Sequence, residues 1–159
     1  MNQIRFYGTS KDIINIKLIE ILNILNDFKK SRTVFWKLLW LDGFGKVKNK
    51  SIQTIEEQLN NSNGLPIVFK DLYLFCSESI RLNNFLLIGD NNSQLVNNLS
   101  LNNYKNAKVD FVIELFDSSF WELSSSKEDF LIYSLKELAN VEIINFSAIK
   151  QSCSMKSKQ

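Results

Sequence analysis

The segment KVDFVIELFDSSFWELS, residues 108–124, constrains the fold more than any other stretch of this chain. Two apolar, β-favouring runs flank a polar turn at 117–119, which is the pattern of an antiparallel hairpin with a three-residue loop. Such a loop places Leu115 directly opposite Trp121. One face of the hairpin is then wholly apolar, and a slip of one residue would turn that face to solvent, so the register is strongly specified.

The same register makes the other face unusual, because Glu114 lies opposite Glu122 with Phe116 and Phe120 beside them. Like charges directly opposite one another destabilise a sheet. Three interpretations are open: the carboxylates splay into water, they await a basic partner, or they form an acid/base pair like that of glycosidases. Aromatic rings beside carboxylates provide burial and charge complementarity at interfaces. The candidate partner-binding residues are therefore Glu114, Phe116, Asp117, Phe120 and Glu122.

Hydrophobic periodicity predicts the remaining elements. Strands are expected at 2–7, 33–41, 85–90 and 140–146, with one or two more in 66–75, and helices through 14–28, 52–60 and 126–139. The Asn-rich stretch 91–106 reads as a long loop or a poor helix. This order predicts an α+β fold, with a mixed or mainly antiparallel sheet of about five to seven strands and three helices packed on it. A single domain over 1–148 and a polar tail over 149–159 are expected.

Several local details are also predicted. Thr9 or Ser10 can cap the first helix, and Ser126 can cap the last one with Asp129 completing a capping box. The last helix could connect the strands on either side of it as a βαβ unit. Trp36 and Trp40 are four residues apart, so they share one side of a regular strand, either in the core or as an exposed pair at an interface.

The chain has no histidine and two widely separated cysteines, Cys76 and Cys153, which we interpret as reduced thiols. The missing imidazole excludes Ser-His-Asp and Cys-His catalysis and histidine-ligated zinc. The GFGK segment at 43–46 is not a P-loop, because Trp40 and Val47 stand where that motif needs Gly and Ser or Thr. We therefore expect no catalytic residue, no metal and no cofactor.

Charge and hydropathy limit the classes of partner that this chain can have. The formal net charge is +2, from 19 basic and 17 acidic residues, which argues against a strongly basic nucleic-acid binder. The longest apolar stretch, 13–28, is interrupted by polar residues and indicates an amphipathic helix rather than a membrane span. With no secretory signal pattern, a cytoplasmic location and no membrane partner are expected.

The segment FVIELFDSSFWELSSSKEDFLIYSLKEL, 111–138, resembles a pattern found among small bacterial immunity proteins of contact-dependent inhibition and other polymorphic toxin systems. The shared features are an apolar strand, an Asp-headed turn, an aromatic-carboxylate strand and an amphipathic helix. The resemblance implies a protein partner, a toxin domain, that is neutralised when its surface is covered. Such proteins are often acidic when they bind nucleases, and this chain is near neutral, so the resemblance does not imply a strongly basic nuclease.

The leading hypothesis is thus a non-catalytic protein-binding module of the immunity-protein kind. Two alternatives stay open. One is a carboxylate-dependent enzyme that uses Glu114 and Glu122, and the other is a nucleic-acid-binding regulator that reads through the basic loop at 46–50.

Overall fold

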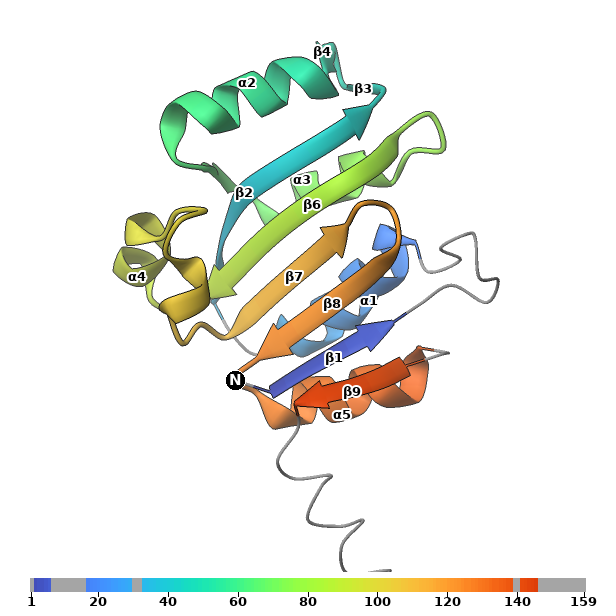
Figure 1. The fold of residues 1–159 in the computed structure, drawn as a ribbon, viewed down its shortest axis with the longest axis vertical. Helices are drawn as coiled ribbons and strands as arrows, with labels where there is room; N and C mark the ends of the chain where they lie inside the picture. The colour runs from blue at the N-terminus through green and yellow to red at the C-terminus, as the bar shows by residue number, and fades with distance from the viewer. Residues whose placement is uncertain (1, 7–16, 30–32, 139–140, 146–159) are drawn as a thin grey trace, which may run out of the picture.

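The computed structural model describes residues 2–6, 17–29, 33–138 and 141–145. These residues form a seven-stranded sheet in the order β5-β2-β6-β7-β8-β1-β9, and all neighbouring strands run antiparallel (Figure 1). The strands are β1 (Asn2–Phe6), β2 (Phe35–Phe44), β5 (Leu65–Ile67), β6 (Arg81–Asp90), β7 (Phe111–Phe116), β8 (Phe120–Ser125) and β9 (Val141–Asn145), and a separate small hairpin contains β3 (Lys46–Val47) and β4 (Lys50–Ser51). The predicted α+β class is confirmed.

The three predicted helices correspond to α1 (Leu18–Lys29), α2 (Ile52–Ser62) and α5 (Glu128–Glu137). Two short α-helices, α3 (Phe69–Leu72) and α4 (Ser93–Asn98), and two 3₁₀ turns, η1 (Tyr73–Cys76) and η2 (Tyr104–Asn106), are added to them. Ser51 caps α2, because the Ser51 hydroxyl accepts the backbone N–H of Thr54 at 3.1 Å. The expected caps Thr9 and Ser10 and the tail 149–159 lie outside the described residues.

The two faces of the sheet are covered differently. Helices α1 and α5 lie on one face, here called the inner face, whereas α4 and η2 lie on the opposite, outer face (Figure 1). The inner core is rich in aromatic rings, and Phe111 packs between Trp36 and Phe130 with ring-centroid distances of 5.6 and 5.0 Å. The outer cluster is smaller and joins residues of β2, β6 and β7 to the 95–109 segment. Part of the outer face is thus apolar and covered, and the candidate residues of the β7–β8 hairpin lie beside that part.

Strand β2 contains a bulge that changes the side on which its tryptophans lie. Leu38 pairs with Leu87 on β6, but the next paired residue is Trp40, opposite Leu86, so Leu39 is an extra residue. The extra residue reverses the alternation of side chains beyond it. Trp36 belongs to the inner core and Trp40 to the outer cluster. The prediction that the two rings share one side is therefore wrong, and the two tryptophans do not form an exposed pair.

The segment 66–75 is a strand only at its start. After β5 the chain turns into α3 and η1, which bury Phe69, Leu72 and Phe75 against the inner core. These three residues are spaced at i, i+3 and i+6, a helical period that β-favouring composition concealed. Pro66 lies on an edge strand, as its missing N–H requires.

The Asn-rich stretch contains both of the predicted conformations. Asn92 caps α4 by accepting the backbone N–H groups of Gln94 and Leu95 at 3.1 and 3.2 Å, and η2 follows after a loop. Asparagine favours such caps because its short side chain reaches the free N–H groups of the first turn. This segment, which contains Tyr104, lies on the outer face of the sheet.

The connection from β8 to β9 is a split βαβ unit. Both strands are antiparallel to β1, which lies between them, so they are parallel to each other. The predicted capping box is absent. Helix α5 begins at Glu128 with no side-chain cap, and the Ser126 hydroxyl instead donates to Asp110 at 3.0 Å. Tertiary contact with Asp110 replaces the local capping bond.

Candidate functional site

The hairpin register is the one that the sequence predicts. Leu115 pairs with Trp121, Phe116 with Phe120, and Glu114 with Glu122. The loop 117–119 is held against β6, because the Asp117 N–H donates to the Asn84 side chain at 2.9 Å. The turn therefore has a fixed position relative to the central strands and is not a free-standing tip.

Two positive φ angles shape this turn. Asp117 and Ser118 have φ values of 43° and 53°, in the left-handed region that Asp tolerates better than most residues. The Ser118 N–H donates to the backbone carbonyl of Asn83 at 2.7 Å, and its hydroxyl donates to the carbonyl of Leu82 at 3.2 Å. These contacts stabilise the strained backbone and leave the Asp117 side chain exposed to solvent.

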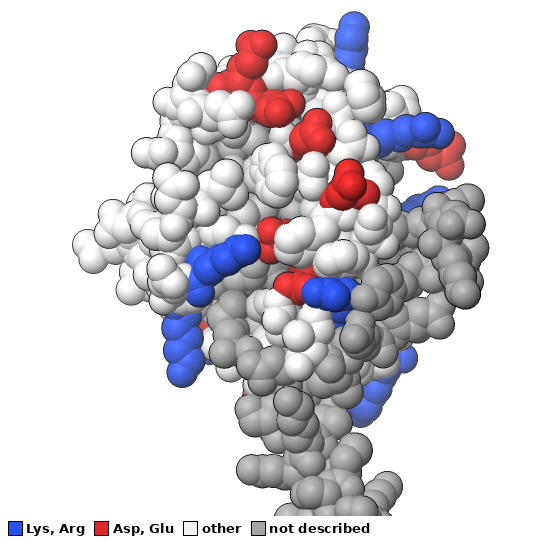
Figure 2. Space-filling model, viewed as in Figure 1, with Lys and Arg blue, Asp and Glu red and all other residues white. Residues whose placement is uncertain are grey.

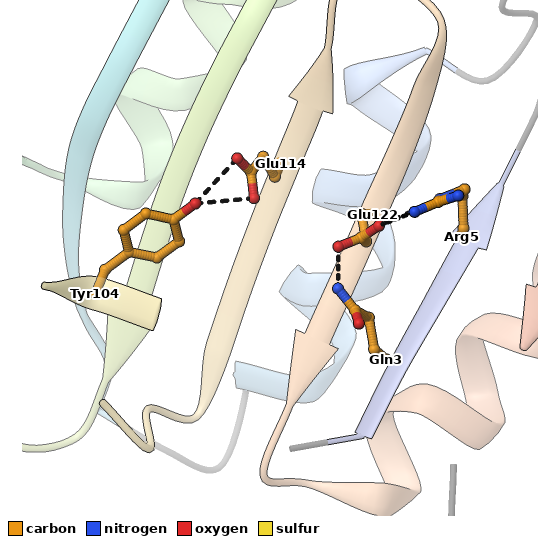
Figure 3. A network of polar contacts seen from close by, with 5 residues as sticks. All are labelled: Gln3, Arg5, Tyr104, Glu114 and Glu122. Carbon is orange, nitrogen blue, oxygen red and sulfur yellow. Dashed lines mark hydrogen bonds and ion pairs between the residues drawn. The ribbon is translucent and has the colours of Figure 1, made fainter. Parts of the chain in front are cut away.

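The two glutamates are buried, each with 7% of its surface exposed. The interpretation that they splay into water is therefore wrong. Each has its own partner, from opposite sides of the hairpin (Figure 3). Burial of two facing carboxylates is costly unless each is paired or protonated, so these partners decide the electrostatics of the face.

Glu122 is held by β1. The Arg5 guanidinium donates to one Glu122 oxygen at 2.9 Å through Nη2 and at 3.2 Å through Nε, and the Gln3 side chain donates to the other oxygen. Arg5 lies directly across from Glu122 in the β1–β8 register, so the ion pair is a cross-strand pair. These charge-assisted bonds satisfy Glu122 as a carboxylate.

Glu114 is held by Tyr104 from η2, whose hydroxyl lies 3.0 and 3.2 Å from the two carboxylate oxygens. No cation forms an ion pair with Glu114 among the described residues. Burial, opposed by this hydrogen bond and by the charge of Lys105, raises the pKa of the Glu114 carboxyl above its usual range. Burial and the neighbouring Glu114 carboxylate also raise the pKa of the Tyr104 hydroxyl.

The aromatic pair lies next to these carboxylates. The rings of Phe116 and Phe120 stack with their centroids 4.9 Å apart at an angle of 30°, and both rings are half-buried. The Arg5 guanidinium lies 4.2 Å from the centroid of the Phe120 ring, a cation–π contact. Arg5 thus joins the aromatic pair to Glu122. The register places four of the five predicted site residues together as the pairs Glu114–Glu122 and Phe116–Phe120, and Asp117 follows Phe116 in the turn.

Figure 2 shows the outer face, on which acidic side chains run from the region of α2 to the centre of the face, with basic side chains beside the lowest of them. The sheet register places Asp42 of β2 in this group through Asn84, whose amide donates to the Asp42 carboxylate at 3.1 Å. Asp42 pairs with Asn84 and Phe116 pairs with Phe120, and Asn84 and Phe116 each lie one residue beyond the paired Phe85 and Leu115. The aromatic pair is thus bordered by acidic groups on one side and by Arg5 on the other.

Other features of the described residues concern metal ions, nucleic acids and membranes. In the described ranges, no three Cys, Asp or Glu side chains are grouped to hold a metal ion. Asp90 accepts the backbone N–H groups of Asn92 and Asp110 at 2.8 and 2.9 Å, which is a turn-stabilising role. The basic loop at 46–50 is the tip of the β3–β4 hairpin, with Lys46, Lys48 and Lys50 exposed. No helix in the described part of the chain has the length and hydropathy needed to cross a bilayer.

Sequence reasoning missed the partners of the two glutamates. Gln3 and Arg5 alternate with the buried Ile4 and Phe6, so their side of β1 was readable, but the β1–β8 pairing was not. Tyr104 lies in a stretch without a regular hydrophobic period, so the sequence gave no sign that it contacts Glu114.

Searches of protein-family models, of curated proteins and of solved structures find no match to this chain. Its function must therefore be argued from the site.

Proposed function

We propose that this protein is a non-catalytic binding module that neutralises a partner protein by covering its surface. The contact surface is the outer tip of the β7–β8 hairpin, formed by Phe116, Asp117, Phe120 and Arg5. The single observation that carries the proposal is the stacked, partly exposed pair of Phe116 and Phe120, with Arg5 against the Phe120 ring and carboxylates beside the pair.

The physical argument concerns preorganisation. Binding hot spots are aromatic or Arg side chains that are desolvated on contact and surrounded by a polar rim. Rings that are already stacked lose little rotamer entropy when a partner covers them, and each immobilised side chain would otherwise cost about 0.5–1.5 kcal/mol. The loop contacts to Asn83 and Asn84 fix the turn in the same way. Such a surface suits tight binding without rearrangement.

Glu114 and Glu122 have supporting roles in this proposal. Because both are buried, a partner reaches the aromatic rings and Asp117 first. Glu122 orients Arg5 through two hydrogen bonds, and Arg5 in turn lies against Phe120. The acidic side chains seen on this face in Figure 2 favour a partner with basic groups around an apolar contact.

For the partner, we propose a bacterial toxin domain, which would make this chain an immunity protein. The proposal rests on the resemblance of the 111–138 segment to such proteins and on the preorganised aromatic tip. The net charge of +2 is too small for the charge of the whole protein to attract a partner strongly. The acidic groups near the tip therefore have to supply the electrostatic attraction.

The test begins with affinity capture from the source cell and identification of the protein that co-elutes. The affinity for that protein is then measured by calorimetry for Phe120→Ala and Phe116→Ala. Loss of a central aromatic anchor costs about 2 kcal/mol or more, so each variant should bind at least about 30-fold more weakly. Phe44→Ala is the matched control, because Phe44 is 61% exposed on β2 and lies outside the proposed surface.

A charge variant tests the contribution of the charged rim separately from that of the two phenylalanines. Asp117→Lys should lower the association rate and weaken its salt dependence, with a smaller effect on dissociation, because a rim charge acts mainly through steering. Thermal unfolding of each variant checks that the fold persists. Full affinity in both phenylalanine variants, with the partner identified, would exclude this surface.

A second function is favoured by one observation, the raised pKa of Glu114 beside a tyrosine hydroxyl. A carboxyl whose pKa is raised keeps its proton to higher pH than a free carboxyl and can act as a general acid, with Glu122 as the second carboxyl facing it. Turnover that vanishes in Glu114→Gln and Glu122→Gln, while the folded spectrum persists, would support a carboxylate-dependent enzyme. Binding that survives these two substitutions would support the binding module.

A further inference from the structure

A cavity of about 640 Å³ lies on the inner side of the same hairpin, away from the aromatic pair. Its apolar floor contains Leu18 of α1, Phe75 of η1, and Leu115 and Trp121 of the hairpin. These four side chains are at least 94% buried, and the more exposed apolar side chains of the lining are Ile19, Ile80 and Leu82. The volume falls within the range of about 300–1,000 Å³ that is typical of small-molecule sites in proteins.

The rim of the cavity is charged. Lys17, just before α1, and Arg81, at the start of β6, both line the cavity and are exposed. Neither has an ion-pair partner among the described residues. Glu78 supplies one negative charge on the same rim, so the local balance is two cations to one anion. The Cys76 thiol also lines the cavity, and burial raises its pKa to about 11, so it stays neutral at neutral pH.

We propose that this cavity binds a small amphipathic anion: an aromatic or aliphatic body on the apolar floor, and a carboxylate or similar group between Lys17 and Arg81. Ligand sites combine an apolar lining with a few placed polar groups that set orientation, and this cavity has both parts. The apolar floor selects for a hydrophobic body, and the excess of positive charge at the mouth selects the sign of the head group. This site is independent of the protein-binding function proposed above.

The geometry also limits the size of the ligand. Ser118 of the 117–119 turn lines the cavity, and so do Phe75 and Cys76 of η1. Ser118 is tied to β6 by hydrogen bonds to Leu82 and Asn83, so this wall is fixed. A bicyclic aromatic acid or a medium-chain fatty acid is small enough for a cavity of about 640 Å³.

The experiment compares two probes of nearly equal size and shape. Naphthaleneacetate carries the charge, and naphthaleneacetamide is its neutral counterpart. Each is titrated into the full chain, and binding is followed by amide NMR. We expect saturable one-to-one binding of the acid, with shifts confined to 17–19, 75–83 and 115–121. The affinity for the amide should be about two- to thirtyfold lower, because two exposed ion pairs of about 0.2–1 kcal/mol each are lost with the charge. No saturable shift, or shifts centred elsewhere, would overturn the site.

Substitutions at the rim test the role of charge. An exposed ion pair contributes about 0.2–1 kcal/mol, so Lys17→Gln and Arg81→Gln should each weaken binding of the acid up to about fivefold and leave binding of the amide unchanged. Lys70→Gln and Lys136→Gln are matched controls on exposed lysines away from the cavity. Equal affinities for acid and amide, or equal effects of rim and control variants, would refute the anion preference.

Discussion

Replacing Tyr104 by Phe isolates one buried hydrogen bond on the outer face. The ring stays in the outer cluster, and only the hydroxyl that donates to Glu114 is lost. A hydroxyl has one proton, so the two distances of 3.0 and 3.2 Å count as one shared hydrogen bond. The variant leaves a carboxyl that is only 7% exposed without a donor among the described residues.

The magnitude follows from that change. A hydrogen bond to a charged group contributes about 1.5–3 kcal/mol, and loss of a donor to a buried acceptor costs a similar amount. The free energy of unfolding should therefore fall by about 1.5–3 kcal/mol at neutral pH. For a chain of this size, each kcal/mol corresponds to a change in Tm of about 2–4 °C. Tyr73→Phe is the control, because the Tyr73 hydroxyl donates to Asn23 at 3.2 Å on the exposed surface, and its loss should cost less than about 0.5 kcal/mol.

The pH dependence gives a second readout. The pKa of Glu114 is raised above its ordinary value of 4.5, mainly by burial, so the folded state holds this proton more tightly than the unfolded chain. The stability that Glu114 contributes is fully present below pH 4.5 and is lost as pH rises through its folded pKa. Glu114→Gln removes this loss and the repulsion from Glu122, so the stability of the wild type relative to this variant should fall as pH rises above 4.5.

The assay is urea unfolding of the wild type, the two single variants and the double variant at several pH values. In the Glu114→Gln background, Tyr104→Phe should cost about 1 kcal/mol, the value for a neutral hydrogen bond, so the cycle should show coupling between the two sites. Equal costs of Tyr104→Phe in both backgrounds, or a flat difference between wild type and Glu114→Gln across pH, would refute the reasoning.

Three other changes test separate features. Gly89→Ala would place a Cβ 2.5 Å from the Trp36 ring, so it should destabilise the fold by about 1–3 kcal/mol in thermal unfolding; an unchanged Tm would contradict this contact. Lys37 is 5% exposed and donates to two backbone carbonyls at the end of α4, so Lys37→Met should cost about 1–3 kcal/mol and accelerate amide exchange in α4; unchanged exchange would argue against that anchor. With Cys153 replaced by Ser, Cys76 should react with iodoacetamide at pH 8 about 100-fold more slowly than a free thiol, because its pKa is about 11, and reaction at the free-thiol rate would show that it is not buried.

Much of the fold follows from short-range patterns. Residues 108–124 predict their own hairpin and its register, because only one pairing puts all apolar side chains on one face. The main helices α1, α2 and α5 follow from their apolar periods in the same way. The errors have local physical causes: the bulge at Leu39 reversed the alternation in β2, and a helical spacing was hidden among β-favouring residues in 66–75.

The candidate site, like the fold, was predictable from the sequence only in part. The sequence by itself determined that Glu114 and Glu122 face each other beside two phenylalanines, since that depends on residues only a few positions apart. Only the tertiary structure decided that both carboxylates are buried and what satisfies them. Arg5 is 117 residues from Glu122 and reaches it because β1 inserts beside β8, and Tyr104 reaches Glu114 because the Asn-rich segment folds over the outer face. Strand order and loop placement depend on the packing of the whole chain, and no local pattern encodes them.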